Sequence, residues 1–204
     1  TCALPILFGT KKPINCYKYA KDLSENSKII VINGVSKMYA MTGFRIGWAV
    51  ANKKIIEAMR CIQGHQTSGP SIIQQQAAVG ALYGVQSSVE NLRLTLENNS
   101  QVLYDLLKSF DGVHVNKPDG TFYCFPDFSY YNKSSKALSD FLLEKVMVLT
   151  VPGVEFGLEG HLRLSTCGTI KDITDGIERI KWALDPNSPN ELYIGERKLV
   201  RDWL

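Results

Sequence analysis

Hydrophobic residues along the chain form short dense runs and helical spacings, a pattern typical of alternating strands and helices. Two apolar runs, residues 29–34 and 44–51, have the length of strands that are buried on both faces of a sheet. A short loop of polar residues and glycines separates them. We expect these two strands to form one edge of an α/β sheet, with the loop at the strand ends, where such sheets commonly bind ligands.

Helical spacing dominates the middle of the chain. Residues 53–63 place apolar side chains on one face of a predicted helix, at Ile55, Ile56, Met59 and Ile62. Residues 64–71 form a predicted loop in which Pro70 is well placed to open the next helix. The helical pattern then runs from Ser71 to about Phe110, with a predicted break near Gly84. Its predicted buried side consists of Leu92, Leu96, Leu103, Leu106 and Leu107.

The last part of the chain has a different pattern, with short strand-like pieces separated by turns. The sequences HVNKPDG, TFYCFPDF, VMVLTVPG and HLRLSTCG are such pieces, and predicted helices near 134–145 and 170–184 lie among them. This pattern indicates a small α+β unit that is separate from the first sheet. The tail, residues 185–204, predicts a short helix docked by Leu199 and Trp203, with a partner-binding tail as the alternative.

Composition excludes several classes of protein. The 204 residues are 45% hydrophobic and 21% charged, which is typical of a soluble globular protein and not of a disordered or collagen-like one. The net charge of +3 has no basic stripe, so we expect no nucleic-acid partner. No apolar run approaches the ~20 residues of a membrane span, so we expect no membrane partner either.

Cysteine usage and the N-terminal residues indicate a cytoplasmic protein. The first residues are apolar before they are basic, which is the reverse of a secretory signal. Five scattered cysteines lack the spacing of metal ligands, and we expect them to be reduced thiols, mostly in buried structural positions. They are Cys2, Cys16, Cys61, Cys124 and Cys167.

The candidate chemistry lies in the loop between the two predicted strands. Lys37 follows the end of the first strand among small and apolar neighbours, and Arg45 follows eight residues later. Lys37 could simply turn outward into water. Alternatively, it is a Schiff-base amine whose pKa falls through partial burial and a neighbouring cation. Arg45 could supply that cation and grip a phosphate with its two-pronged donors, or be a surface arginine.

Residues 34–48 resemble the lysine signature of fold-type I, class I/II aminotransferases, which use pyridoxal phosphate (PLP). The matching positions are Ser36, Lys37, Ala40, Gly43, Arg45, Ile46 and Gly47. The resemblance implies that Lys37 forms a Schiff base with PLP and moves a proton during catalysis, and that Arg45 binds the cofactor phosphate with help from Ser36. The family often has a hydroxyl residue three positions before the lysine, where this chain has Gly34.

Two further segments extend the resemblance. Residues 62–82 resemble the family's next loop and helix, which implies that Thr67 and Ser68 approach the active site of the neighbouring subunit in a homodimer. HLRLSTC places Arg163 where the family keeps the arginine that clamps the substrate's α-carboxylate. A carboxylate held by two parallel hydrogen bonds fixes the amino acid with its Cα–H bond across the cofactor plane.

The resemblance covers roughly residues 6–184 and implies an α/β fold. It assigns residues 1–70 to the C-terminal part of the PLP-binding large domain, 71–110 to connecting helices, 111–184 to a small α+β C-terminal domain, and 185–204 to a tail. The implied reaction transfers an amino group between an amino acid and a 2-oxo acid, with PLP as cofactor. Within the family, the chain resembles the aspartate aminotransferase-like enzymes.

Family members are considerably longer at the N-terminus, so we expect this chain to be truncated. The chain lacks the family's aspartate–x–x–tyrosine element before the lysine strand and a glycine-rich phosphate loop. We therefore expect weak PLP binding at best from the chain alone. Two alternatives stay open: another fold-type I PLP enzyme, such as a lyase or synthase, and a non-catalytic aminotransferase-like remnant that serves regulation or dimerisation.

Overall fold

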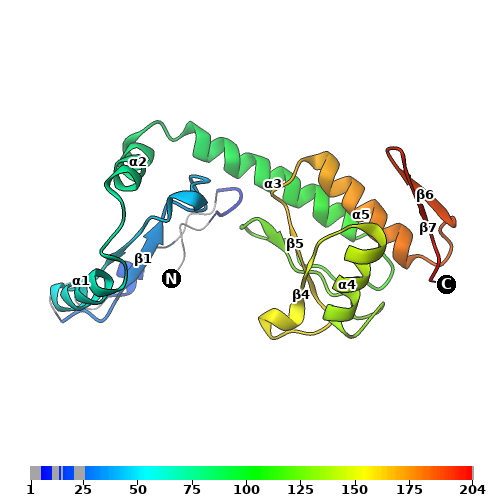
Figure 1. Cartoon of the computed structure of the whole chain (residues 1–204), viewed down its shortest axis with the longest axis horizontal. Helices are drawn as coiled ribbons and strands as arrows, with labels where there is room; N and C mark the ends of the chain where they lie inside the picture. Colours follow the sequence, from blue (N-terminus) through cyan, green and yellow to red (C-terminus); the bar gives the residue numbers. More distant parts are fainter. Residues whose placement is uncertain (1–5, 11–13, 15, 21–25, 204) are drawn as a thin grey trace. The chain divides into compact units, whose positions relative to one another are not determined.

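The structure is a computed structural model that describes residues 6–10, 14, 16–20 and 26–203. The chain divides into two compact units, Thr1–Leu94 and Thr95–Leu204, and helix α3 (Ser87–Leu107) contains the boundary between them (Figure 1). Each unit is described by itself below. The four-part division of the chain stays a prediction.

Unit 1 contains a two-stranded sheet and two helices. Its elements are η1 (Cys16–Tyr19), β1 (Val31–Gly34), η2 (Thr42–Phe44), β2 (Gly47–Val50), α1 (Lys53–Thr67) and α2 (Ile72–Tyr83). The strands are antiparallel, and Gly34 lies opposite Gly47. A Cβ atom on Gly34 would lie 2.9 Å from the carbonyl oxygen of Ile46, so a glycine is needed for the strands to approach this closely.

The predicted burial of unit 1 is wrong in this chain. Ile32 of β1 is 43% exposed and Val50 of β2 is 46% exposed, whereas strands with this composition are usually covered on both faces. Helix α1 has no fully buried residue, and its predicted apolar face is covered only in part, because Ile55 and Ile56 are half-buried whereas Met59 and Ile62 are exposed. Helix α2 buries only Ala78. The buried cluster of unit 1 consists of Val35, Ile46 and Ala78. Two strands and two helices bring too little apolar surface together to cover one another.

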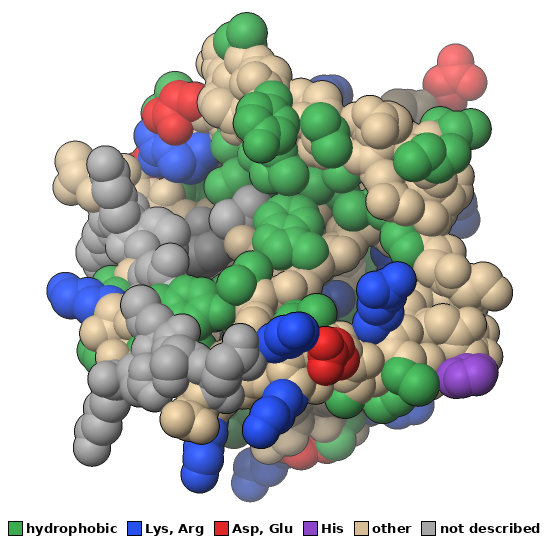
Figure 2. All heavy atoms as spheres, turned by 90° about the vertical axis from the view of Figure 1, so that its left-hand side faces the viewer, with side chains coloured by type: hydrophobic (Ala, Val, Ile, Leu, Met, Phe, Trp, Pro, Cys, Tyr) green, Lys and Arg blue, Asp and Glu red, His purple; other side chains and the backbone are tan. Residues whose placement is uncertain are grey.

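Hydrophobic side chains therefore remain on the surface of unit 1. Figure 2 shows several patches of hydrophobic side chains on the face that it draws. The large exposed side chains of the two helices are Met59, Ile62, Ile72, Ile73, Val79, Leu82 and Tyr83. Exposed apolar side chains in such number are typical of an interaction surface.

The helix boundaries follow capping rules. The side chain of Asn52 accepts a hydrogen bond of 2.9 Å from the backbone N–H of Ile55 and caps the start of α1. Helix α1 continues to Thr67, so the first half of the predicted loop 64–71 is helical, and the turn begins only at Ser68. Helix α2 begins after its N-cap residue Ser71, which directly follows Pro70. The predicted break at Gly84 is confirmed, because that residue ends α2.

Unit 2 contains the residues of the predicted small α+β unit together with the second half of α3 and the tail. Its elements are β3 (Tyr123–Cys124), α4 (Ser135–Val146), β4 (Val151–Pro152), η3 (Gly153–Phe156), β5 (Leu162–Ser165), α5 (Ile170–Leu184), β6 (Glu191–Ile194) and β7 (Arg197–Val200). Strand β5 lies between β3 and β4, and both pairings are antiparallel. The predicted helices near 134–145 and 170–184 are confirmed. The segment HVNKPDG forms no strand, and His114 makes only an isolated bridge with Asp127.

Side chains of strand β5 alternate between a packed face of the sheet and an open one. Leu162 and Leu164 are buried, while Arg163 between them is half-buried and Ser165 is exposed, as the two-residue period of a strand requires. The buried face joins a large core that also includes α3, α4 and α5. The core members with almost no exposed surface are Leu103, Leu107, Phe128, Leu142, Val146, Leu162 and Ile180. The backbone of β5 that carries Arg163 is therefore held by a well-packed core.

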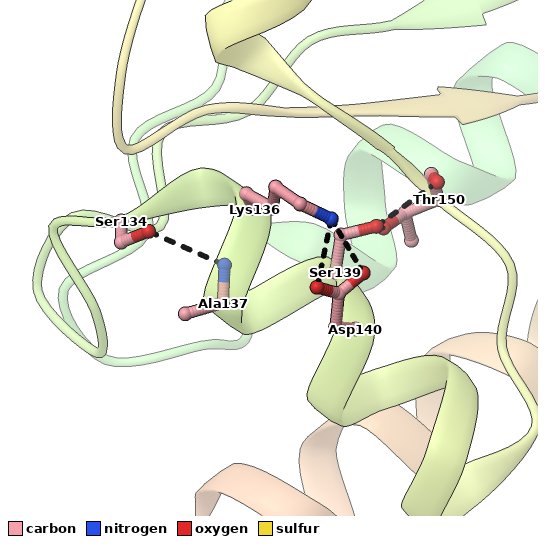
Figure 3. Close-up of polar contacts among 6 residues, drawn as sticks. All are labelled: Ser134, Lys136, Ala137, Ser139, Asp140 and Thr150. Atoms are coloured by element: carbon pink, nitrogen blue, oxygen red, sulfur yellow. Dashed lines mark hydrogen bonds and ion pairs between the residues drawn. The ribbon is translucent and has the colours of Figure 1, made fainter.

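Helix α4 is joined to the segment before β4 by hydroxyl groups. The Ser139 hydroxyl donates to the carbonyl oxygen of Thr150 at 3.1 Å, and the Thr150 hydroxyl donates to the Ser139 hydroxyl at 2.9 Å (Figure 3). At the start of the same helix, the Ser134 hydroxyl accepts from the backbone N–H of Ala137 at 3.2 Å (Figure 3). These contacts fix both the beginning of α4 and the approach to β4.

A capping box fixes the start of α5. The Thr169 hydroxyl accepts from the backbone N–H of Asp172 at 3.1 Å, and the Asp172 carboxylate accepts from the backbone N–H of Thr169 at 3.0 Å. The carboxylate also accepts from the Thr169 hydroxyl at 2.7 Å. These hydrogen bonds lower the pKa of Asp172 below its ordinary value.

The lowered pKa of Asp172 predicts a specific loss of stability in acid. The pKa of Asp172 in the folded state is below the unfolded value of ~4. The contribution of this carboxylate to the free energy of unfolding is therefore complete above that pH and disappears as the pH falls through the folded pKa. We expect Asp172→Asn to lower the free energy of unfolding at pH 7 and to make its decrease below pH ~4 shallower. Urea unfolding at several pH values measures this. Thr169→Ala should have the same effect, and an acid limb as steep as the parent's would contradict the prediction.

The tail is a β-hairpin rather than the predicted helix. Strands β6 and β7 are antiparallel, and Gly195 in the two-residue loop has a φ of +57°, which favours this tight turn. Alternating exposure along ELYI, a strand pattern, outweighs the helical spacing that the prediction used. The predicted docking residues are confirmed, because Leu199 is buried and Trp203 packs against the same core.

The predicted cysteine roles are confirmed only in part. Cys124 is buried, which raises the pKa of its thiol to about 11, whereas Cys61 and Cys167 are exposed. All three are free thiols. Cys2 and the side chain of Cys16 lie outside the described part of the structure. Over the residues that are described, no helix combines the length and apolar character needed to cross a membrane.

Candidate active site

The pairing of β1 with β2 positions the loop that carries Lys37. The backbone N–H of Val35 donates to the carbonyl oxygen of Ile46 at 3.3 Å, and both side chains are buried. The loop between these two residues is therefore closed at its base. The backbone N–H of Ala40 donates to the carbonyl oxygen of Lys37 at 3.2 Å, which places Lys37 in a tight turn directly beyond the base.

Lys37 is exposed and Ser36 is half-buried. The partial burial expected for a Schiff-base amine is therefore not found at Lys37. The reason is the small buried cluster of unit 1, which consists of Val35, Ile46 and Ala78 and leaves little apolar material to cover the amine. An exposed primary amine is accessible to a carbonyl compound.

Arg45 lies at the opposite end of the same loop, in a left-handed conformation with a φ of +52°. Its guanidinium donates from Nη1 to the carbonyl oxygen of Thr42 at 3.1 Å, which orients the side chain. Arg45 lines a groove of about 490 Å³ together with Arg60 and Gln63 of α1. Among the described residues, Lys37 does not line this groove.

The groove contains polar residues that the sequence analysis did not select. Arg60 and Gln63 follow Ile56 in α1 at intervals of about one helical turn, and Ile56 also lines the groove with Arg45. A helical projection of α1 would therefore have shown Arg60 and Gln63 on the same face as Ile56. Two guanidinium groups facing one groove suit an anion with two negative charges, such as a phosphate monoester.

Thr67 and Ser68 lie at the end of α1, and both are exposed. The side chain of Gln63 donates to the Thr67 hydroxyl, and Ser68 adopts a left-handed conformation with a φ of +58° that ends the helix. Both hydroxyl residues are therefore presented at a sharp turn on the surface of unit 1.

Arg163 belongs to unit 2, where two aromatic rings enclose its guanidinium. The guanidinium carbon lies 4.3 Å from the ring centroid of Tyr123 and 4.9 Å from that of Phe156. Within the part of the chain that the structure describes, no residue accepts a hydrogen bond from this guanidinium or forms an ion pair with it. Arg163 is therefore held by cation–π contacts and keeps its N–H donors available.

This arrangement determines how an anion can approach. The rings of Tyr123 and Phe156 occupy part of the space around the guanidinium, and a ligand that pairs with it approaches the edge, where the N–H groups point. A planar carboxylate can then form two parallel hydrogen bonds, which is the strongest neutralising contact that arginine makes.

The turn after β5 is fixed from α3. The side-chain amide of Asn99, which is buried, donates to the carbonyl oxygens of Thr166 and Gly168 at 2.9 Å each. Asn99, Tyr123 and Phe156 were not selected in the sequence analysis. Their roles depend on contacts between residues far apart in the chain, which spacing does not reveal.

The structure brings Ser36, Lys37 and Arg45 together in one loop of unit 1 and places Arg163 on the open sheet face of unit 2. The comparison with known protein families gives a match to aminotransferase class I and II over residues 6–180. That range includes all four of these residues.

Curated relatives and solved structures agree with this match. The chain is 36% identical over 188 residues to a probable aspartate/prephenate aminotransferase from Rickettsia felis, covering 87% of this chain and 46% of that protein. It is 39% identical over 159 residues to an aspartate aminotransferase from Bacillus sp. strain YM-2, covering 76% and 41%. The structure of an aromatic aminotransferase from Pyrococcus horikoshii matches with a TM-score of 0.81 and 28% identity, covering 87% and 48%.

The chain spans about half the length of the curated relatives it matches. The aspartate aminotransferase from Rhizobium meliloti matches in the same way, with a TM-score of 0.80, 28% identity, and coverage of 87% of this chain and 47% of that one. The confirmed α/β fold, the family match over most of the residues and these relatives all lead to one conclusion: the chain belongs to the class I and II aminotransferases.

Proposed function

We propose that this chain carries the cofactor lysine and the substrate-carboxylate arginine of a PLP-dependent aminotransferase that moves an amino group between an amino acid and a 2-oxo acid. Members of the family use PLP. The observation that carries the proposal is Arg163, a half-buried residue whose guanidinium contacts two aromatic rings and has no hydrogen-bond acceptor or ion-pair partner among the described residues. A guanidinium prepared in this way fits the α-carboxylate common to amino acids and 2-oxo acids.

The donor groups of unit 1 fit PLP. Lys37 supplies an accessible primary amine for the aldehyde, and Arg45 and Arg60 face a groove that can take the phosphate. The hydroxyl of the half-buried Ser36 is a further donor in the same loop. When bound, PLP supplies an electron sink for the carbanion character that develops at the substrate's Cα.

The chain's own residues then have separate tasks. Arg163 binds the α-carboxylate and fixes the orientation of the amino acid. The amine of Lys37 holds the cofactor and, once released from it, accepts and returns the proton at the substrate's Cα. Arg45 neutralises the phosphate and supplies a positive charge in the loop that also contains Lys37.

We also propose a homodimer that acts in the cytoplasm, with Thr67 and Ser68 at the turn that faces the neighbouring subunit. Class I and II aminotransferases are typically dimeric. The exposed hydrophobic side chains of α1 and α2 support an interaction surface on unit 1.

Removal of the Arg163 guanidinium tests the proposed carboxylate site. We expect Arg163→Leu to raise the dissociation constant for succinate by about 10- to 100-fold, because two charge-assisted hydrogen bonds are lost. Titration of the whole chain with succinate, followed by NMR, measures the constant. Arg197→Leu on the exposed strand β7 is the matched control and should bind as the parent does. Equal binding by Arg163→Leu and the parent would contradict the proposal.

A further inference from the structure

The ring of Phe156 needs a support, because the ring itself is half in solvent. Phe156 ends the short helix η3 and is 50% exposed, yet it covers one face of the Arg163 guanidinium at 4.9 Å. Besides Arg163, its ring contact is an edge-to-face arrangement with Phe125 at 5.8 Å. The position of such a ring depends on how firmly the backbone of residues 153–159 is held.

Hydrogen bonds between Ser135, the first residue of α4, and two residues of this loop hold it in place. The Ser135 hydroxyl donates to the Glu159 carboxylate at 2.7 Å, and the Ser135 backbone N–H donates to the same oxygen at 2.8 Å. The Ser135 hydroxyl also accepts from the backbone N–H of Val154 at 3.1 Å. We name these three hydrogen bonds the Ser135–Glu159 clasp. The clasp joins the beginning and the end of the loop to the first turn of α4.

The loop is folded tightly around the clasp. A Cβ atom on Gly153 would lie 2.2 Å from the carbonyl oxygen of Leu158, so the loop closes on itself at this glycine. The backbone N–H of Leu158 donates to the carbonyl oxygen of Gly153 at 3.0 Å. The side chain of Ser135 is completely buried, and the hydrogen bonds from Ser135 lower the pKa of Glu159 below its ordinary value. Glu159 is therefore an ionised acceptor at neutral pH.

We propose that the Ser135–Glu159 clasp positions Phe156 over Arg163 and thereby raises the affinity of Arg163 for a carboxylate. The inference rests on the proposed function for its carboxylate ligand. Ser135 and Glu159 are positioning residues, because they act on Arg163 only through the ring of Phe156. Loss of one cation–π contact corresponds to about a two- to fivefold higher dissociation constant for succinate.

The test compares variants of two adjacent serines in the full chain. Ser135→Ala and Glu159→Gln weaken the clasp. Ser134→Ala is the matched control, because it removes the helix cap to Ala137 in the same turn of α4 and leaves the clasp intact (Figure 3). The readout is the NMR signal of the Arg163 Nε–H group, which the ring currents of Tyr123 and Phe156 displace. Phe156→Leu gives the signal expected when one ring is absent.

We expect the Arg163 signal of Ser135→Ala and Glu159→Gln to move toward that of Phe156→Leu, with a two- to fivefold weaker binding of succinate. The signal of Ser134→Ala should stay at the parent's position. If Ser135→Ala unfolds, Glu159→Gln at the exposed end of the clasp decides the question. Clasp variants with the parent's Arg163 signal would overturn the inference. A parent chain that shows no response to succinate would instead overturn the carboxylate site of the proposed function.

Discussion

Replacement of Lys37 by alanine is expected to abolish covalent attachment of PLP to this chain and to reduce the proposed amino transfer by about 10²- to 10⁴-fold. The magnitude follows from the two tasks proposed for the amine, which holds the cofactor and moves the proton at the substrate's Cα. No other group in the loop between β1 and β2 can replace it, because Lys37 is the one primary amine in residues 35–46.

Attachment is measured by reduction of the chain with borohydride in the presence of PLP, followed by mass spectrometry of its peptides. We expect the label on the peptide that contains Lys37, and no label in its place in Lys37→Ala. Lys54→Ala on α1 is the matched control, because Lys54 is also exposed in unit 1 and lies outside the loop. Equal labelling of several lysines in the parent would contradict the assignment and favour a non-catalytic remnant.

The second large effect concerns stability. Leu142→Ala is expected to lower the free energy of unfolding of unit 2 by about 2–5 kcal/mol. Leu142 has no exposed surface and lies in the core that α4 shares with α3 and α5, so its removal leaves a cavity. A smaller unfolding free energy should also loosen the support of Arg163 on β5.

The neighbouring residue provides the control. Leu143 lies next to Leu142 on α4 but is 49% exposed, and we expect Leu143→Ala to change the unfolding free energy by less than about 1 kcal/mol. Urea unfolding followed through the fluorescence of Trp182 and Trp203 reports on unit 2, where both residues pack. Similar midpoints for the two variants would show that α4 does not contribute to the core in this way.

The sequence predicted the helices well because their signals are local. The break at Gly84 and the helices near 134–145 and 170–184 each depend on residues within a few positions. The hairpin formed by β6 and β7 was missed, although Gly195 between alternating residues is a local signal for it.

Burial and the rings around Arg163 were harder to predict. Apolar composition at Ile32 indicates a covered strand, but whether the strand is covered depends on which other segments pack on it. Tyr123 lies in β3, and Phe156 lies in η3, which follows β4. Only the register of β3 and β4 with β5 brings both rings to the guanidinium of Arg163. The lysine and arginine signature identified the chemistry, whereas the contacts that prepare Arg163 needed the fold.

The small buried cluster of unit 1 has a consequence for ligand binding. Among the described residues, the hydrophobic cluster of unit 1 is small and consists of Val35, Ile46 and Ala78, so we expect the unit to open at a small cost in free energy and its ordered form to be a fraction of the population. A ligand held by the loop between β1 and β2 must first select that form, and its apparent affinity falls by the same fraction. Any surface that covers β1 and α2 would raise the fraction and tighten binding without touching the ligand. Association with such a surface and occupancy by the cofactor are then linked equilibria.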